Sequence, residues 1–64
     1  MMNNNNTNIP NDPIILLSYI NTKLRDEYPS LKELCLGLDV NQTDLIDKLN
    51  NIGYKYSEES NRFI

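Results

Sequence analysis

Apolar residues recur with a helical period over the first half of the chain. Four of them lie at i, i+3, i+7 and i+11, one stripe of a helix: Leu17, Ile20, Leu24 and Tyr28. Asp12 suits the N-cap, and Pro13 suits the first helical position because no backbone donor is needed there. Pro29 interrupts the pattern, since a residue before proline avoids the α region. The pattern predicts one helix over about Pro13–Tyr28.

Two shorter helical patterns follow. The apolar positions of the first are Leu31, Leu34, Cys35 and Leu38. Ser30 and Glu33 are spaced as a capping box at its start, and we expect Gly37 to end it with a positive φ. Asn41 caps the next helix and Gly53 ends it, and its buried side is Leu45, Ile46, Leu49 and Ile52. The two patterns predict a pair of helices around a tight turn.

The C-terminal segment reads as a β-hairpin, in which "YKYS" and "RFI" flank the polar turn "EESN". Tyr54 and Tyr56 share one strand face. Because an isolated hairpin is barely stable, we expect this face to rest on the helices, against Ile52 and Phe63. The expected fold is mostly α, a small α+β domain of three helices and a C-terminal two-stranded hairpin over residues 9–64. We expect the Asn-rich residues 1–8 to form a disordered tail.

The two short helices resemble a helix-turn-helix, and the hairpin adds a likeness to a winged helix. The key positions of that motif are taken by Cys35, Val40, Leu45 and Leu49. Asp39 stands where the turn usually has glycine, and Asp is among the residues that tolerate positive φ. Such a scaffold would normally suggest DNA binding, so the distribution of charge has to decide.

Charge argues against nucleic acid as the partner. The formal net charge is −3, and there is no histidine. Residues 39–51, where bases would be read, contain three Asp and one Lys, a net charge of −2. DNA binding relies on several cationic contacts to phosphates, which this helix does not supply. The alternative function is a dimeric DNA-binding transcriptional regulator that pools Lys23, Arg25, Lys32 and Lys48.

The sequence offers little for catalysis or for a cofactor. Without histidine and with one cysteine, it lacks the soft ligands of a metal site and any internal disulfide. We expect Cys35 to be a core residue, and Glu58 and Glu59 to be solvated turn residues. No signal peptide is recognisable, and "IILL" is far shorter than a membrane span. We therefore expect a cytoplasmic, non-catalytic protein without cofactor, metal, small-molecule substrate or membrane contact.

The first predicted helix carries the candidate partner-binding residues. Ser18, Asn21 and Arg25 form a polar ridge that could grip a partner's backbone. In the other interpretation, Arg25 pairs with Asp26, Glu27 or the hairpin, while Asn21 hydrogen-bonds a loop carbonyl. The run "IILL" points around most of the helix, so something should cover Ile15 or Leu16. Either the segment around residues 9–10 folds back over them, or a second copy or a partner helix does.

These observations lead us to expect a protein–protein interaction or adaptor module, with a homodimer as one form of it. The candidate partner-binding residues are Ile15, Leu16, Ser18, Tyr19, Asn21 and Arg25.

A more direct resemblance covers about residues 9–64. The chain resembles the bacterial domain-of-unknown-function family 4250, short proteins with an Asp-Pro, Leu-Leu-Ser, Asn, Leu-Arg-Asp and Gly-Tyr-x-Tyr pattern. The matching positions are Asp12, Pro13, Leu16, Leu17, Ser18, Asn21, Leu24, Arg25, Asp26, Gly53, Tyr54, Tyr56, Asn61 and Phe63. The resemblance implies no activity, because none is assigned to the family. The Asn-rich start departs from the pattern.

Overall fold

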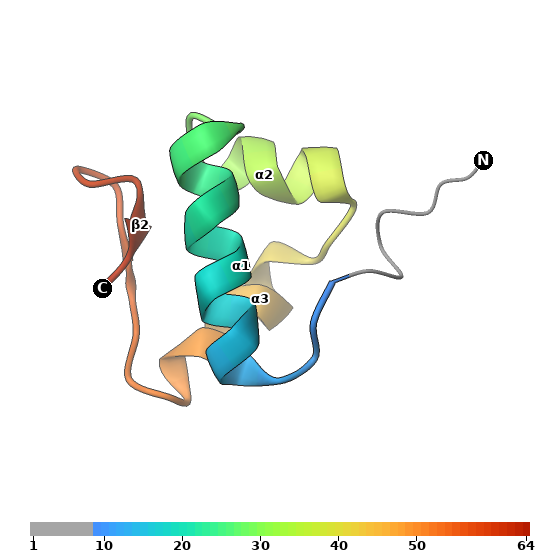
Figure 1. Ribbon diagram of the computed structural model, residues 1–64, viewed down its shortest axis with the longest axis vertical. Coiled ribbons are helices and arrows are strands. Elements are labelled where there is room, and N and C mark those ends of the chain that lie inside the picture. The colour runs from blue at the N-terminus through green and yellow to red at the C-terminus, as the bar shows by residue number, and fades with distance from the viewer. Residues whose placement is uncertain (1–8) are drawn as a thin grey trace.

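The computed structural model describes residues 9–64, in which three helices precede a hairpin (Figure 1). The elements are α1 (Pro13–Asp26), α2 (Leu31–Leu38), α3 (Gln42–Asn50), β1 (Tyr56–Ser57) and β2 (Arg62–Phe63). The strands are antiparallel. In Figure 1, α1 occupies the centre, with the hairpin along one side and α2 on the other. The mostly α, small α+β arrangement is confirmed, and the predicted tail lies outside the described residues.

Local signals set the ends of α1. The Asp12 carboxylate accepts hydrogen bonds from two first-turn amides, at 2.9 and 3.2 Å, as an N-cap does. The helix ends at Asp26, two residues before the predicted end at Tyr28. The Tyr28 N–H bonds the carbonyl of Lys23 at 3.0 Å, which closes the last turn and directs the chain into α2.

The predicted caps of α2 and α3 are present. The Ser30 hydroxyl accepts from the Glu33 amide at 3.1 Å, and the Asn41 side chain accepts from the Asp44 amide at 2.9 Å. Each cap satisfies an N–H that has no partner inside its helix. Short helices of this kind depend on such caps, because a few turns of isolated helix are marginal in water.

The prediction of a positive φ at Gly37 was wrong. Gly37 lies inside α2, and Asp39 adopts the left-handed conformation that ends the helix, with φ 57°. Gly37 has a packing role instead, since a Cβ there would lie 2.5 Å from a ring carbon of Tyr28. Asp39 holds the turn position that the helix-turn-helix pattern assigned to it.

The core lies where α1, α2, α3 and β2 meet. Its buried side chains are Leu16, Ile20, Leu24, Leu31, Leu34, Cys35, Leu38, Leu45, Leu49 and Phe63. Cys35 is a core residue, as predicted, and burial raises the pKa of its thiol. On α1 the core stripe begins at Leu16 and continues through Ile20 and Leu24, whereas the predicted Leu17 is only half-buried. Within residues 9–64, no helix combines the length and the apolar character needed to cross a membrane.

Candidate functional site

Asn21 attaches the hairpin to α1. Its Oδ1 accepts the Phe63 N–H at 2.8 Å, and its Nδ2 donates to the Phe63 carbonyl at 3.0 Å. Lys55 and Ile64 exchange both of their backbone hydrogen bonds, at 2.9 Å each. Because such pairs alternate along an antiparallel ladder, the next pair, Tyr56 with Phe63, is not hydrogen-bonded. The Phe63 backbone therefore points away from β1, and the Asn21 amide takes the place of a third strand.

Asn61 attaches the other end of the hairpin. Its Nδ2 donates to the carbonyls of Leu24, at 3.1 Å, and Tyr28, at 3.0 Å, at the end of α1. Its Oδ1 accepts from the Tyr56 hydroxyl, whose oxygen accepts the Leu31 N–H at 3.2 Å. Asn61 itself has a φ of 52°, a left-handed conformation that Asn tolerates. The hairpin is thus fixed to α1 at two levels and to the start of α2.

The predicted polar ridge of α1 is divided by these contacts. Asn21 binds the backbone of this chain's own strand, as in the second interpretation but with a strand in place of a loop. Arg25 pairs with Asp26, with Nε–Oδ1 2.8 Å and a second hydrogen bond of 3.0 Å. Hydrogen bonding in this pair raises the pKa of Arg25 and lowers that of Asp26. Ser18 is exposed.

The predicted apolar surface at the head of α1 is divided as well. Leu16 is 3% exposed and belongs to the core, so this predicted partner-binding residue does not reach the surface. Its neighbours Ile14 and Ile15 are 62% and 58% exposed. Tyr19 is half-buried against the core, as is Ile9. The segment around Ile9 therefore folds back onto the core but leaves two isoleucines open.

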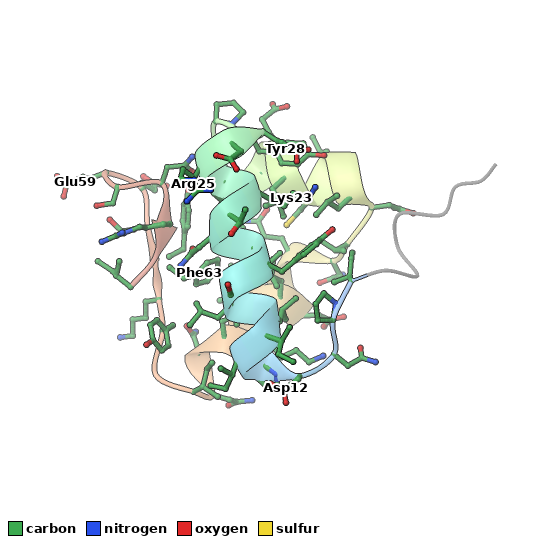
Figure 2. All side chains as sticks on the ribbon, in the orientation of Figure 1. Asp12, Lys23, Arg25, Tyr28, Glu59 and Phe63 are labelled. Carbon is green, nitrogen blue, oxygen red and sulfur yellow. The ribbon has the colours of Figure 1, made fainter. Side chains whose placement is uncertain are left out.

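A groove of about 930 Å³ lies between α1 and the hairpin and includes Ser18, Asn21 and Arg25. Figure 2 shows Arg25 on the side of α1 that faces the hairpin, and Lys23 on the opposite side. Ile14, Leu17 and Tyr54 make one end apolar. Ser18 and Thr22 line the middle, and the other end contains Arg25, Ser60, Asn61 and Arg62. Within the described residues, no carboxylate lines this groove.

Sequence reasoning missed the hairpin's contribution to the groove. Tyr54 was expected to rest on the helices beside Tyr56, yet it is 36% exposed while Tyr56 is half-buried and its ring lies 5.5 Å from that of Phe63. Gly53, with φ 90°, precedes Tyr54 and is the sequence signal for a change of direction there. Arg62 gave no signal, since only the docking of β2 brings it to the same groove as Arg25.

A second groove, of about 650 Å³, lies between β1, the start of α2 and one side of α3. It contains charges of both signs, from Lys32, Lys55 and Glu58. Across residues 9–64, Cys, Asp and Glu side chains do not gather in groups of three that could hold a metal ion. The groove between α1 and the hairpin thus offers apolar contacts, hydrogen bonds and cations, which suits recognition by contact.

The positions that carry the family resemblance have two kinds of role. Asp12, Asn21 and Asn61 build the frame through the hydrogen bonds described above. Leu17 and Tyr54 line the groove, together with Ser18 and Arg25. The resemblance therefore covers both the frame and the groove.

Comparison with known proteins places the chain by its sequence. Searches of curated proteins and of solved structures gave no match. The model of one family, described as Domain of unknown function (DUF4250), matches residues 10–63, which include every helix and strand described above. This chain therefore belongs to the family Domain of unknown function (DUF4250).

Proposed function

We propose that this protein is a non-catalytic module that binds another polypeptide in the groove between α1 and the hairpin. The observation that carries the proposal is the order of side chains along the groove. An apolar end at Ile14 and Tyr54 is followed by hydroxyls and then by the guanidinium groups of Arg25 and Arg62. A polypeptide offers apolar, hydrogen-bonding and charged groups along one chain, and so can match all three zones at once.

Apolar side chains gather at one end of the groove. Single exposed apolar side chains are common on protein surfaces and need no explanation. Here Ile14, 62% exposed, and Tyr54, 36% exposed, line the same end of the groove as half-buried Leu17. Apolar contacts bordered by polar groups are the usual composition of a protein–protein interface.

The groove is also preorganised. Its two walls are α1 and the hairpin, and the hydrogen bonds of Asn21 and Asn61 join them. A partner that enters the groove does not have to order either wall first. Because ordering costs reduce affinity, a fixed groove favours binding.

Polypeptide is favoured over DNA by the charge on α3. Asp44 and Asp47 are exposed on this helix, and Asp39 is exposed just before it, whereas Lys48 is half-buried. Phosphates brought to that surface would be repelled. The alternative is a dimeric DNA-binding regulator in which α2, α3 and the hairpin act as a winged helix. The charge on α3 makes it the second choice.

The proposal can be tested with a displayed library of random peptides selected on the whole protein. Ser18→Trp fills the middle of the groove from an exposed helical position, and Thr43→Trp makes the same change on exposed α3, away from the groove. Selected peptides should bind wild type and Thr43→Trp with the same affinity. Their affinity for Ser18→Trp should be lower by about tenfold or more. Equal losses in both variants, or no selected sequence, would contradict the proposal.

The DNA alternative has its own measurement. We expect no mobility shift of duplex DNA by micromolar protein at low salt. Binding that weakens steeply as salt is added would favour the regulator and count against a polypeptide partner.

Self-association is one form of the proposed function, with a second copy as the partner. Light scattering after gel filtration measures it directly. Ile14→Glu is the informative variant because Ile14 is exposed and lines the groove, whereas a change at Leu16 would damage the core. A dimer that Ile14→Glu dissociates identifies a homodimer through the groove, and a monomer in both proteins leaves the groove to other chains.

A further inference from the structure

We propose that the polypeptide bound in this groove is an acidic one, an extended segment with an apolar end and a carboxylate-bearing end. This inference rests on the proposed function and adds the chemical class of its partner. It is drawn from the contrast between the charge of the groove and the charge of the whole protein, and from the contacts of the two arginines.

The groove has the opposite charge to the chain. The sequence contains nine Asp and Glu against six Lys and Arg. The groove nevertheless contains two arginines and, in the described part of the chain, neither Asp nor Glu. Complementary charge of this kind selects a partner and steers its approach more than it adds raw affinity. A carboxylate-bearing segment is therefore attracted to this groove, although the chain as a whole is negatively charged.

Arg62 is the cation that a ligand can engage most directly. It is exposed on β2, where alternation points its side chain away from the core that Phe63 enters. Within residues 9–64, ion pairs join Lys23 to Glu27 and Arg25 to Asp26, and Arg62 takes part in neither. A guanidinium can form two parallel hydrogen bonds to a single carboxylate.

Arg25 can contribute as well, although it already pairs with Asp26. Both side chains of this pair are largely exposed, at 74% and 49%. Exposed ion pairs contribute little to stability, so exchanging Asp26 for a ligand carboxylate costs little. The two arginines together form a cationic end that can receive two neighbouring carboxylates.

The length of the groove fixes the size of the segment. Ile14 and Arg25 are 11 residues apart on α1. At 1.5 Å per residue the helix advances about 16 Å between them. An extended chain covers that distance in about five residues. The expected ligand therefore has an apolar side chain near Ile14 and Tyr54, and carboxylates about five residues away.

The test uses the full chain and dye-labelled seven-residue peptides, with fluorescence anisotropy as the measurement. The acidic probe has Leu-Phe at one end and three Glu at the other, and a matched probe has Gln in place of each Glu. Both probes are made with the apolar end first and with it last. We expect the acidic probe to bind roughly tenfold more tightly at low ionic strength, and the difference to shrink as salt is added.

Two variants of the protein locate the effect. Arg62→Gln removes the unpaired cation and should cancel most of the preference for the acidic probe. Lys32→Gln removes an exposed cation that lines the second groove instead, and should change nothing. Amide chemical shifts of Ser18, Tyr54 and Arg62 should move on binding and show where the peptide lies.

The outcomes separate this inference from the proposed function. Equal binding of the Glu and Gln probes, with shifts at the groove, would overturn the acidic partner and leave polypeptide binding intact. Loss of binding in Lys32→Gln rather than Arg62→Gln would place the peptide in the second groove and overturn the inference. No binding of either probe, with no peptide selected from the library, would overturn both. Duplex DNA that competes through Arg62 would show that phosphates are the ligand, and would also overturn both.

Discussion

The α2–α3 pair and the hairpin are both short, yet they are held against α1 in different ways. Most of the core comes from helices, whereas the hairpin contributes one buried side chain, Phe63. The hairpin is held largely by polar contacts. Asn21 of α1 bonds the backbone of Phe63, and Asn61 of the hairpin bonds the carbonyls at the end of α1. Strands of two residues bury too little apolar area to dock by themselves, and side-chain amides supply the missing partners.

The magnitudes support this comparison. Burial of a phenylalanine contributes roughly 1.5–3 kcal/mol. Five hydrogen bonds join the hairpin to the helices, from Asn21, Asn61 and Tyr56. At about 1 kcal/mol net for each, their contribution equals or exceeds that of Phe63. The polar junction is therefore as important as the apolar contact for the wall of the groove.

The largest effect is expected in the apolar region. Leu49→Ala should lower the free energy of unfolding by about 2–5 kcal/mol, because the side chain is fully buried and leaves a cavity. Urea denaturation followed by circular dichroism measures the loss. Leu36→Ala on α2 is the matched control, since Leu36 is 69% exposed and should change stability little. Similar losses in both would show that the helix pair is not held by burial.

The next effect tests the polar junction. Asn21→Leu should cost about 2–3 kcal/mol, because it leaves the N–H and the carbonyl of Phe63 without partners. Hydrogen exchange of the Phe63 amide should accelerate more than that of amides in α2. Thr22→Leu changes the adjacent exposed residue and should leave both measurements almost unchanged. Equal effects of the two substitutions would show that the Asn21 hydrogen bonds do not hold the hairpin against α1.

A smaller effect isolates the backbone conformation of Asn61. Both Asn61→Gly and Asn61→Ala remove its side-chain hydrogen bonds, but only glycine adopts a φ of 52° without strain. Asn61→Ala should therefore be less stable than Asn61→Gly by about 1 kcal/mol in urea denaturation. Two equally stable variants would mean that the folded protein does not require a left-handed conformation at residue 61.

The smallest effect comes from the exposed pair of Arg25 and Asp26. The hydrogen bond from Arg25 holds the pKa of Asp26 below its ordinary value, so the folded state gains stability when Asp26 is ionised. This gain is present at neutral pH and is lost as the pH falls below about 4. The difference in stability between wild type and Asp26→Asn should therefore be slight at pH 7 and should vanish in acid. If the difference in stability between wild type and Asp26→Asn grew in acid, ionised Asp26 would not be the stabilising form.

The sequence by itself determined the elements whose causes lie within a few residues. The caps at Asp12, Ser30 and Asn41 each bind an amide no more than three residues away, and apolar periodicity marked the helices between them. The hairpin was also predictable from the polar turn "EESN" between its strands. Such contacts depend on local geometry alone, so the order of residues is enough to predict them.

Only the tertiary structure decided how these elements combine. Asn21 and its partner Phe63 are 42 residues apart, and the groove exists because that contact brings Arg62 and Tyr54 alongside α1. The same holds for Gly37, whose role is set by the ring of Tyr28 rather than by its own backbone. Pairing across such distances depends on which face of one element meets another, and a local pattern contains no information about that choice.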